Sequence, residues 1–89
     1  LMNEEEKQYF KENIDKIDEE IKDLLLKRLK NVKEIGKIKK KRGIDILDKS
    51  REDYIINRLT SNLDIEETKY ISNIYINIFK ESKNIEDGR

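Results

Sequence analysis

The sequence predicts an all-α protein whose protomer has three helices, with one long N-terminal helix, and which intertwines with a second copy into a six-helix homodimeric bundle. Apolar residues recur at helical spacing through most of the 89 residues, and proline is absent. Hydrophobic residues make up 35% of the chain and charged residues 45%. A lone copy would therefore have little to bury, and oligomerisation is a common remedy at this size.

The first helix is predicted from about Glu4 to Arg42. Alternating steps of four and three residues give an apolar seam that consists of Phe10, Ile14, Ile17, Ile21, Leu24, Ile35 and Ile38. Such a heptad seam is typical of a helix that lies against another helix. Arg28 and Asn31 interrupt it, and a charge that faces a helical core is costly unless it is paired. We expect a second copy of the helix, packed antiparallel, to close the seam.

Both ends of this helix carry local signals. Asn3 and Glu6 have the spacing of a capping box. A basic run at 39–42 followed by Gly43 has the form of a helix C-terminus. Gly36, inside the helix, costs about 1 kcal/mol relative to alanine. We expect this glycine to admit a close neighbour.

The second helix follows a short linker, Ile44 to Leu47. Asp48 is its predicted N-cap, and the helix is expected to run to about Ser61. Helical spacing assigns to its inner face Tyr54, Ile55, Ile56 and Leu59.

The third helix follows a turn at Asn62 and Leu63. Asp64 and Glu67 form a second capping-box pattern at its start, and it is predicted to end near Ile85. Its apolar positions keep a helical period and are Ile71, Ile74, Tyr75, Ile78, Phe79 and Ile85.

The composition excludes several classes of function. Basic and acidic residues are equal in number, 20 each, so no net field attracts nucleic acid or an anionic membrane. Without cysteine or histidine there is no thiol nucleophile, no imidazole base and none of the commonest zinc ligands. No apolar run is long enough to span a membrane, and no secretory signal is visible. We expect a soluble, cytoplasmic protein.

Polar residues nevertheless fall on helix faces that should be buried. Arg28 and Lys39 are eleven residues apart, so they point to the same side of the first helix. The other helices contribute Asp48, Arg51, Glu52, Ser82 and Glu86. Each has an ordinary structural explanation: Arg28 can pair with Glu52, Asp48 can be only a cap, and Glu86 can be solvated. Five of these residues together predict a pocket between helices for a small polyanion such as a dicarboxylate. They are Arg28, Lys39, Arg51, Glu52 and Glu86.

Five stretches of the sequence, in order, resemble the all-helical chorismate mutase family. They are Ile14–Asp18, Leu24–Arg28, Gly36–Lys39, Asp48–Glu52 and Ser82–Glu86. The resemblance covers nearly the whole chain and implies a single domain over residues 1–89. It further implies an intertwined dimer with two active sites that converts chorismate to prephenate in phenylalanine and tyrosine biosynthesis. No cofactor and no metal are implied.

The resemblance also implies catalytic roles for four residues. Lys39 and Glu86 would donate hydrogen bonds to the ether oxygen whose bond breaks. Glu52 would accept a hydrogen bond from the substrate hydroxyl, and Arg28 would bind a substrate carboxylate within its own subunit. The rearrangement is pericyclic and needs no nucleophile or proton abstraction, so the absence of histidine and cysteine is compatible with it.

Four further residues would help to bind the substrate. Lys11 would reach a carboxylate in the partner's site, Asp48 would lie beside Glu52, Arg51 would help to hold the anion, and Ser82 would assist at a carboxylate. Two positions depart from the family pattern. Lys11 replaces the forked guanidinium of arginine with a point charge. Glu86 stands where glutamine or glutamate occurs, and a carboxyl donates only when it is protonated.

Lys11 and Lys39 would lie about 42 Å apart on one straight helix, so they can share one small ligand only across a dimer. The dimer and the assignment of the site therefore depend on each other.

Two alternatives remain: an isochorismate-pyruvate lyase of the same fold, and a non-catalytic helical module for dimerisation or regulation. The chain can also be fused to, or associate with, another enzyme of the aromatic pathway.

Overall fold

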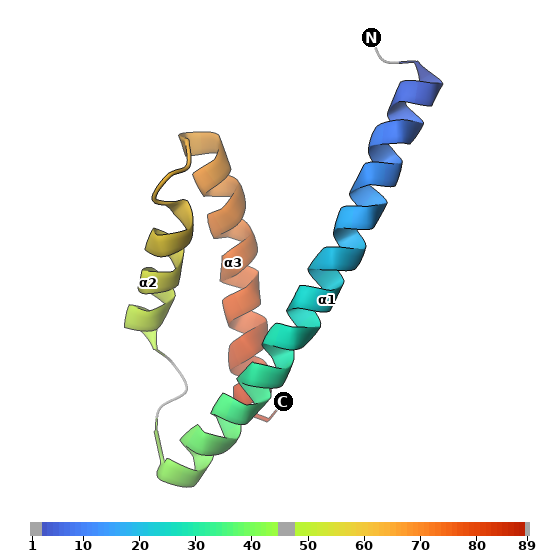
Figure 1. Cartoon of the computed structure of the whole chain (residues 1–89). Helices are drawn as coiled ribbons and strands as arrows, with labels where there is room; N and C mark the ends of the chain where they lie inside the picture. The colour runs from blue at the N-terminus through green and yellow to red at the C-terminus, as the bar shows by residue number, and fades with distance from the viewer. Residues whose placement is uncertain (1–2, 45–47, 89) are drawn as a thin grey trace. The chain divides into compact units, whose positions relative to one another are not determined.

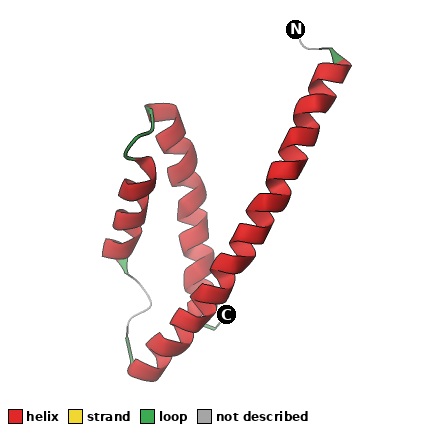
Figure 2. Ribbon diagram, in the orientation of Figure 1, coloured by secondary structure: helices red, strands yellow, loops and turns green. Residues whose placement is uncertain are grey.

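A computed structural model describes residues 3–44 and 48–88 of the chain, and within them it contains helices and no strand (Figures 1 and 2). The helices are α1 (Glu4–Arg42), α2 (Lys49–Thr60) and α3 (Ile65–Glu86). The predicted all-α, three-helix protomer is therefore confirmed, with helix ends within about one residue of those expected. Residues 45–47 of the predicted linker lie outside the described residues. The intertwined dimer stays a prediction.

The chain divides into two units, Leu1–Asn31 and Val32–Arg89. The first contains the N-terminal part of α1, and the second contains the remainder of α1 together with α2 and α3. Within the second unit, α2 and α3 lie side by side as an antiparallel pair (Figure 1). No described helix has both the length and the apolar character needed to cross a membrane.

In the first unit, α1 is capped as expected but leaves its apolar seam uncovered. The Asn3 side chain accepts a hydrogen bond from the Glu6 backbone N–H at 2.8 Å. The seam side chains are between 48 and 62% exposed, and they are Phe10, Ile14, Ile17, Ile21 and Leu24. A contiguous exposed apolar stripe of this kind is typical of an interaction surface.

In the second unit, α1 ends in a Schellman motif. Gly43 adopts a φ of 67°, and its backbone N–H donates to the carbonyl of Lys40 at 3.4 Å. The N–H of Ile44 donates to the carbonyl of Lys39 at 2.9 Å. These bonds satisfy carbonyls that the helix end would otherwise leave without partners. Gly43, which the sequence predicted as the end of the helix, therefore allows the chain to turn back so that the Lys39 carbonyl is hydrogen-bonded.

The other two helices begin at the residues that the sequence predicted. The Asp48 side chain accepts from the Arg51 backbone N–H at 2.9 Å and caps α2. At α3, the N–H of Glu67 donates to Asp64 Oδ1 at 2.7 Å, and Glu67 Oε1 accepts from the N–H of Asp64 at 3.2 Å. This reciprocal pair is a complete capping box.

Each helix contributes one buried apolar side chain to the core of the second unit: Val32, Ile55 and Phe79, all 7–8% exposed. The buried residues of α1 are Val32 and Gly36, and Lys39 is half-buried. These three residues of α1 each follow directly after a position of the predicted seam. α1 therefore presents two distinct faces: one packs within the unit, and the seam, including Ile35 and Ile38, remains exposed.

The prediction that Tyr54 belongs to the inner face of α2 is wrong for the single chain, because this side chain is 55% exposed. The guanidinium groups of Arg51 and Arg58 lie 5.3 and 5.7 Å from the centre of its ring. Both arginines lie one helical turn from Tyr54, on the same side of α2. The cation–π contacts and the phenol hydroxyl explain why this apolar ring tolerates the solvent side of the helix.

Gly36 has the close neighbour that the sequence led us to expect. A Cβ atom built at Gly36 would lie 2.9 Å from the Cα atom and 3.3 Å from the carbonyl oxygen of Glu86. Both atoms belong to the backbone, so neither can be moved by a side-chain rotation. Gly36 thus allows the end of α3 to approach α1 closely.

We predict that Gly36→Ala lowers the free energy of unfolding by about 1–3 kcal/mol, because the added methyl group forces α1 and α3 apart. Helix propensity alone would change stability by about 1 kcal/mol in the opposite direction. Urea denaturation at fixed protein concentration measures the difference. Lys33→Ala, at an exposed position of the same helix, is the control and should shift stability by less than about 0.5 kcal/mol. A Gly36→Ala variant as stable as the wild type would show that the contact does not constrain the packing.

Candidate active site

Two ion pairs connect the end of α3 with the other two helices of the second unit. Lys39 Nζ on α1 lies 3.1 Å from Glu86 Oε1 on α3, with only 18% and 9% of the two side chains exposed. Lys83 Nζ on α3 lies 3.4 Å from Glu52 Oε2 on α2. The structure therefore pairs two of the four residues that the sequence predicted as catalytic, Lys39 and Glu86, and it pairs a third, Glu52, with Lys83, three residues before Glu86 on α3.

The pair between Lys39 and Glu86 is formed by two helix ends. Lys39 lies in the last turn of α1, and its backbone carbonyl accepts the hydrogen bond from Ile44 N–H in the Schellman motif. Glu86 is the last residue of α3, where Asp87 N–H donates to the Lys83 carbonyl at 2.9 Å. Because Gly36 lets the two backbones approach, both side chains can meet over a short distance.

Glu86 is the one charged residue among the described residues that is buried, at 8% exposure. Removing a carboxylate from water is costly, and a buried ion pair seldom adds net stability compared with apolar side chains of similar size. The fold therefore gains little from a charge pair at this position. A charged pair at this position is therefore a candidate functional site.

Three other predicted site residues make local contacts in the same unit. Asp48 caps α2, and the exposed Arg51 lies over the ring of Tyr54. Ser82 is half-buried, and its Oγ donates to the carbonyl of Ile78 at 2.7 Å. These contacts are the ordinary structural roles of a cap, a surface cation and a helical serine. Their predicted roles in substrate binding stay predictions.

Arg28 and Lys11 lie on the first unit. Arg28 is half-buried and Lys11 is exposed. Their predicted contacts with substrate carboxylates, one within the subunit and one in the partner's site, stay predictions.

Lys83 was not among the predicted site residues. The sequence signal was available: Lys83 directly follows Ser82 and precedes Glu86 by three residues, so it lies close to both on α3. What the sequence could not supply is the pairing of α2 with α3, which brings Lys83 to Glu52.

Among the described residues, no cluster of three or more acidic side chains is arranged to hold a metal ion.

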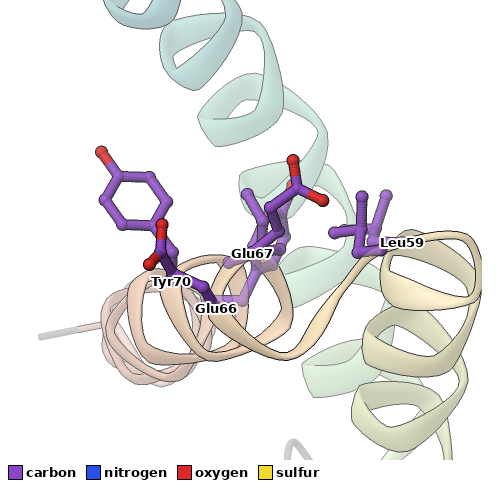
Figure 3. A pocket seen from close by; sticks show the side chains of 7 residues that line it. Leu59, Glu66, Glu67 and Tyr70 are labelled. Atoms are coloured by element: carbon purple, nitrogen blue, oxygen red, sulfur yellow. The ribbon is translucent and has the colours of Figure 1, made fainter.

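A cavity of about 600 Å³ lies elsewhere in the second unit, between the end of α2 and the start of α3 (Figure 3). It is lined by Leu59, Leu63, Glu66, Glu67, Tyr70, Ile71 and Tyr75. It shares no residue with the two ion pairs, and its lining contains carboxylates but no cation. Such a surface would repel a dicarboxylate, so the cavity is not a candidate site for one.

Comparison with known proteins identifies the family. No curated protein matches the chain at a significant level, and no solved structure does. The family model for chorismate mutase type II matches residues 10–87, which include both ion pairs and nearly all of the three helices. This all-helical family agrees with the fold and with the predicted resemblance, and the chain therefore belongs to the chorismate mutase type II family.

Proposed function

We propose that this protein is a chorismate mutase, which converts chorismate to prephenate for phenylalanine and tyrosine biosynthesis in the cytoplasm. Membership of the family supports the reaction class. The observation that carries the proposal for this chain is the buried pair of Lys39 and Glu86, which places an ammonium and a carboxyl group 3.1 Å apart at one point of the second unit.

The reaction breaks the ether C–O bond and forms a C–C bond within the same molecule, so nothing is added or lost. Negative charge develops on the ether oxygen as its bond to carbon breaks, and donors aimed at that oxygen lower the barrier. Lys39 donates from its ammonium group. Glu86 donates from the other side of the oxygen, and for this it must carry a proton.

The second contribution is to hold the extended substrate in the compact conformation that reacts. Glu52 accepts from the substrate hydroxyl with Asp48 beside it, and Arg28 and the partner's Lys11 bind the two carboxylates. Arg51 and Ser82 complete the binding of the anion. No nucleophile and no general base take part in this scheme.

The proposed site needs a second copy of the chain. A straight helix would separate Lys11 and Lys39 by about 42 Å, so in this proposal only the Lys11 of a partner reaches the substrate. The exposed seam of α1 supports a homodimer, because apolar side chains that are half exposed in one copy would be buried by another.

The direct test is to incubate the purified chain with chorismate and, separately, with isochorismate. Chorismate mutase activity gives prephenate from the first. Release of pyruvate from isochorismate without prephenate formation would identify a lyase of the same fold. No turnover of either compound by a dimer of the expected mass would identify a non-catalytic module.

In the same assay we expect Lys39→Ala to lower kcat by at least about a hundredfold, since it removes a donor to the ether oxygen. The dimer should persist, as measured by light scattering, and circular dichroism should retain the helical spectrum. Wild-type turnover by this variant would remove Lys39 from the mechanism.

The carboxyl group at position 86 predicts a pH dependence. Because only a protonated carboxyl donates, we expect kcat/KM to fall as pH rises. Glu86→Gln should flatten this profile, since an amide donates at any pH. A wild-type profile that does not change with pH would contradict the role of Glu86.

We predict that Leu24→Lys converts the dimer to a monomer and abolishes activity, because a charge would replace a seam side chain that is 62% exposed in the single chain. Analytical ultracentrifugation measures the mass. Asp23→Lys, at the neighbouring exposed position off the seam, introduces the same side chain and should remain an active dimer. Monomeric behaviour of both variants, or of neither, would show that the seam is not the interface.

A further inference from the structure

The last turns of α3 carry two opposite charges that pair with different helices. Lys83 pairs with Glu52 of α2, and Glu86 pairs with Lys39 of α1. Charges three residues apart on α1 instead pair along their own helix, as three exposed pairs do. The four charges therefore alternate in sign across three helices, and Lys83 is the member to which the proposed mechanism assigns no task.

The contact of Lys83 is suited to orienting the carboxylate of Glu52. Lys83 Nζ lies near one carboxylate oxygen, Oε2, at 3.4 Å. A carboxylate has a second oxygen with its own acceptor sites, so Glu52 can be held through Oε2 while Oε1 accepts from a ligand hydroxyl. The Glu52 side chain is only 19% exposed, so few waters compete for it.

The same contact is poorly suited to stabilising the fold. The Lys83 side chain is 37% exposed, and ion pairs that water reaches contribute little to stability. A lysine stem also loses conformational freedom when its end is held in place. A consequence of the pair should therefore appear in ligand binding and turnover rather than in the stability of the protein.

We propose that Lys83 is a positioning residue, which holds the Glu52 carboxylate in the orientation that accepts the substrate hydroxyl. This inference rests on the proposed function, because it needs a substrate whose hydroxyl meets Glu52. It adds to the site a residue from α3 that acts through another side chain and does not touch the reacting atoms.

The test is a double-mutant cycle in the chorismate assay, with Lys83→Met, Glu52→Gln and the double variant. We expect Lys83→Met to lower kcat/KM about five- to tenfold, mainly through KM, as expected for one weakened hydrogen bond to a charged group. In the Glu52→Gln background, the same substitution should change kcat/KM less than about twofold, because the residue through which it acts is already altered.

Two further variants complete the design. Lys83→Arg keeps the positive charge and should restore most of the lost kcat/KM. Lys80→Met, one turn earlier on α3 and exposed, is the matched control and should behave as the wild type. The melting temperatures of all variants should stay within a few degrees of the wild type.

The outcomes separate the two proposals. An equal loss in both backgrounds would show that Lys83 contacts the substrate directly, and unchanged kcat/KM in Lys83→Met would show that it has no part in turnover; either result overturns the inference while leaving the mutase intact. A wild-type chain that does not convert chorismate would overturn the proposed function and this inference with it.

Discussion

The close approach of α3 to α1 at Gly36 is the constraint on which the packing of the second unit and the candidate site depend. The backbone of Glu86 lies so near that no Cβ fits at Gly36. In the same region the Lys39 and Glu86 side chains meet at 3.1 Å. The helix ends that carry these residues are closed by local hydrogen bonds, so neither side chain depends on a frayed turn. A glycine that weakens the helix locally thus permits the one buried charge of the described chain.

α1 has two different faces, and the residues of one face follow those of the other by one position in the sequence. Val32, Gly36 and Lys39 face the second unit, and each directly follows a seam position. The seam itself remains exposed along α1. This division explains how a chain with 35% hydrophobic residues can have so small a core: a large part of its apolar surface lies on the face that the helices of one copy leave uncovered. Folding of one copy would then bury one side of α1, and association with a second copy would bury the other side.

The ends of the helices could be predicted because capping interactions are local in sequence. Contacts between helices could not be predicted, because they depend on tertiary packing. The caps at Asp48 and Asp64 and the stop at Gly43 act within one turn, so the sequence located the helix ends closely. The importance of Gly36 was visible, but its neighbour lies fifty residues away and only the structure identifies it. Helical period alone placed Tyr54 inside, because it ignores the arginines that cover the ring. Lys83 was missed because its partner is on another helix.

The carboxyl group at position 86 has two tasks that require different forms. In the structure its Oε1 faces the Lys39 ammonium at 3.1 Å, where a carboxylate is the natural partner of a cation. In the proposed reaction it must donate, which requires a proton. A glutamine at this position would remove the ion pair and would donate without first gaining a proton. In the proposed mechanism the glutamate therefore links the packing of α1 against α3 to the chemistry, because the same carboxyl group would serve both.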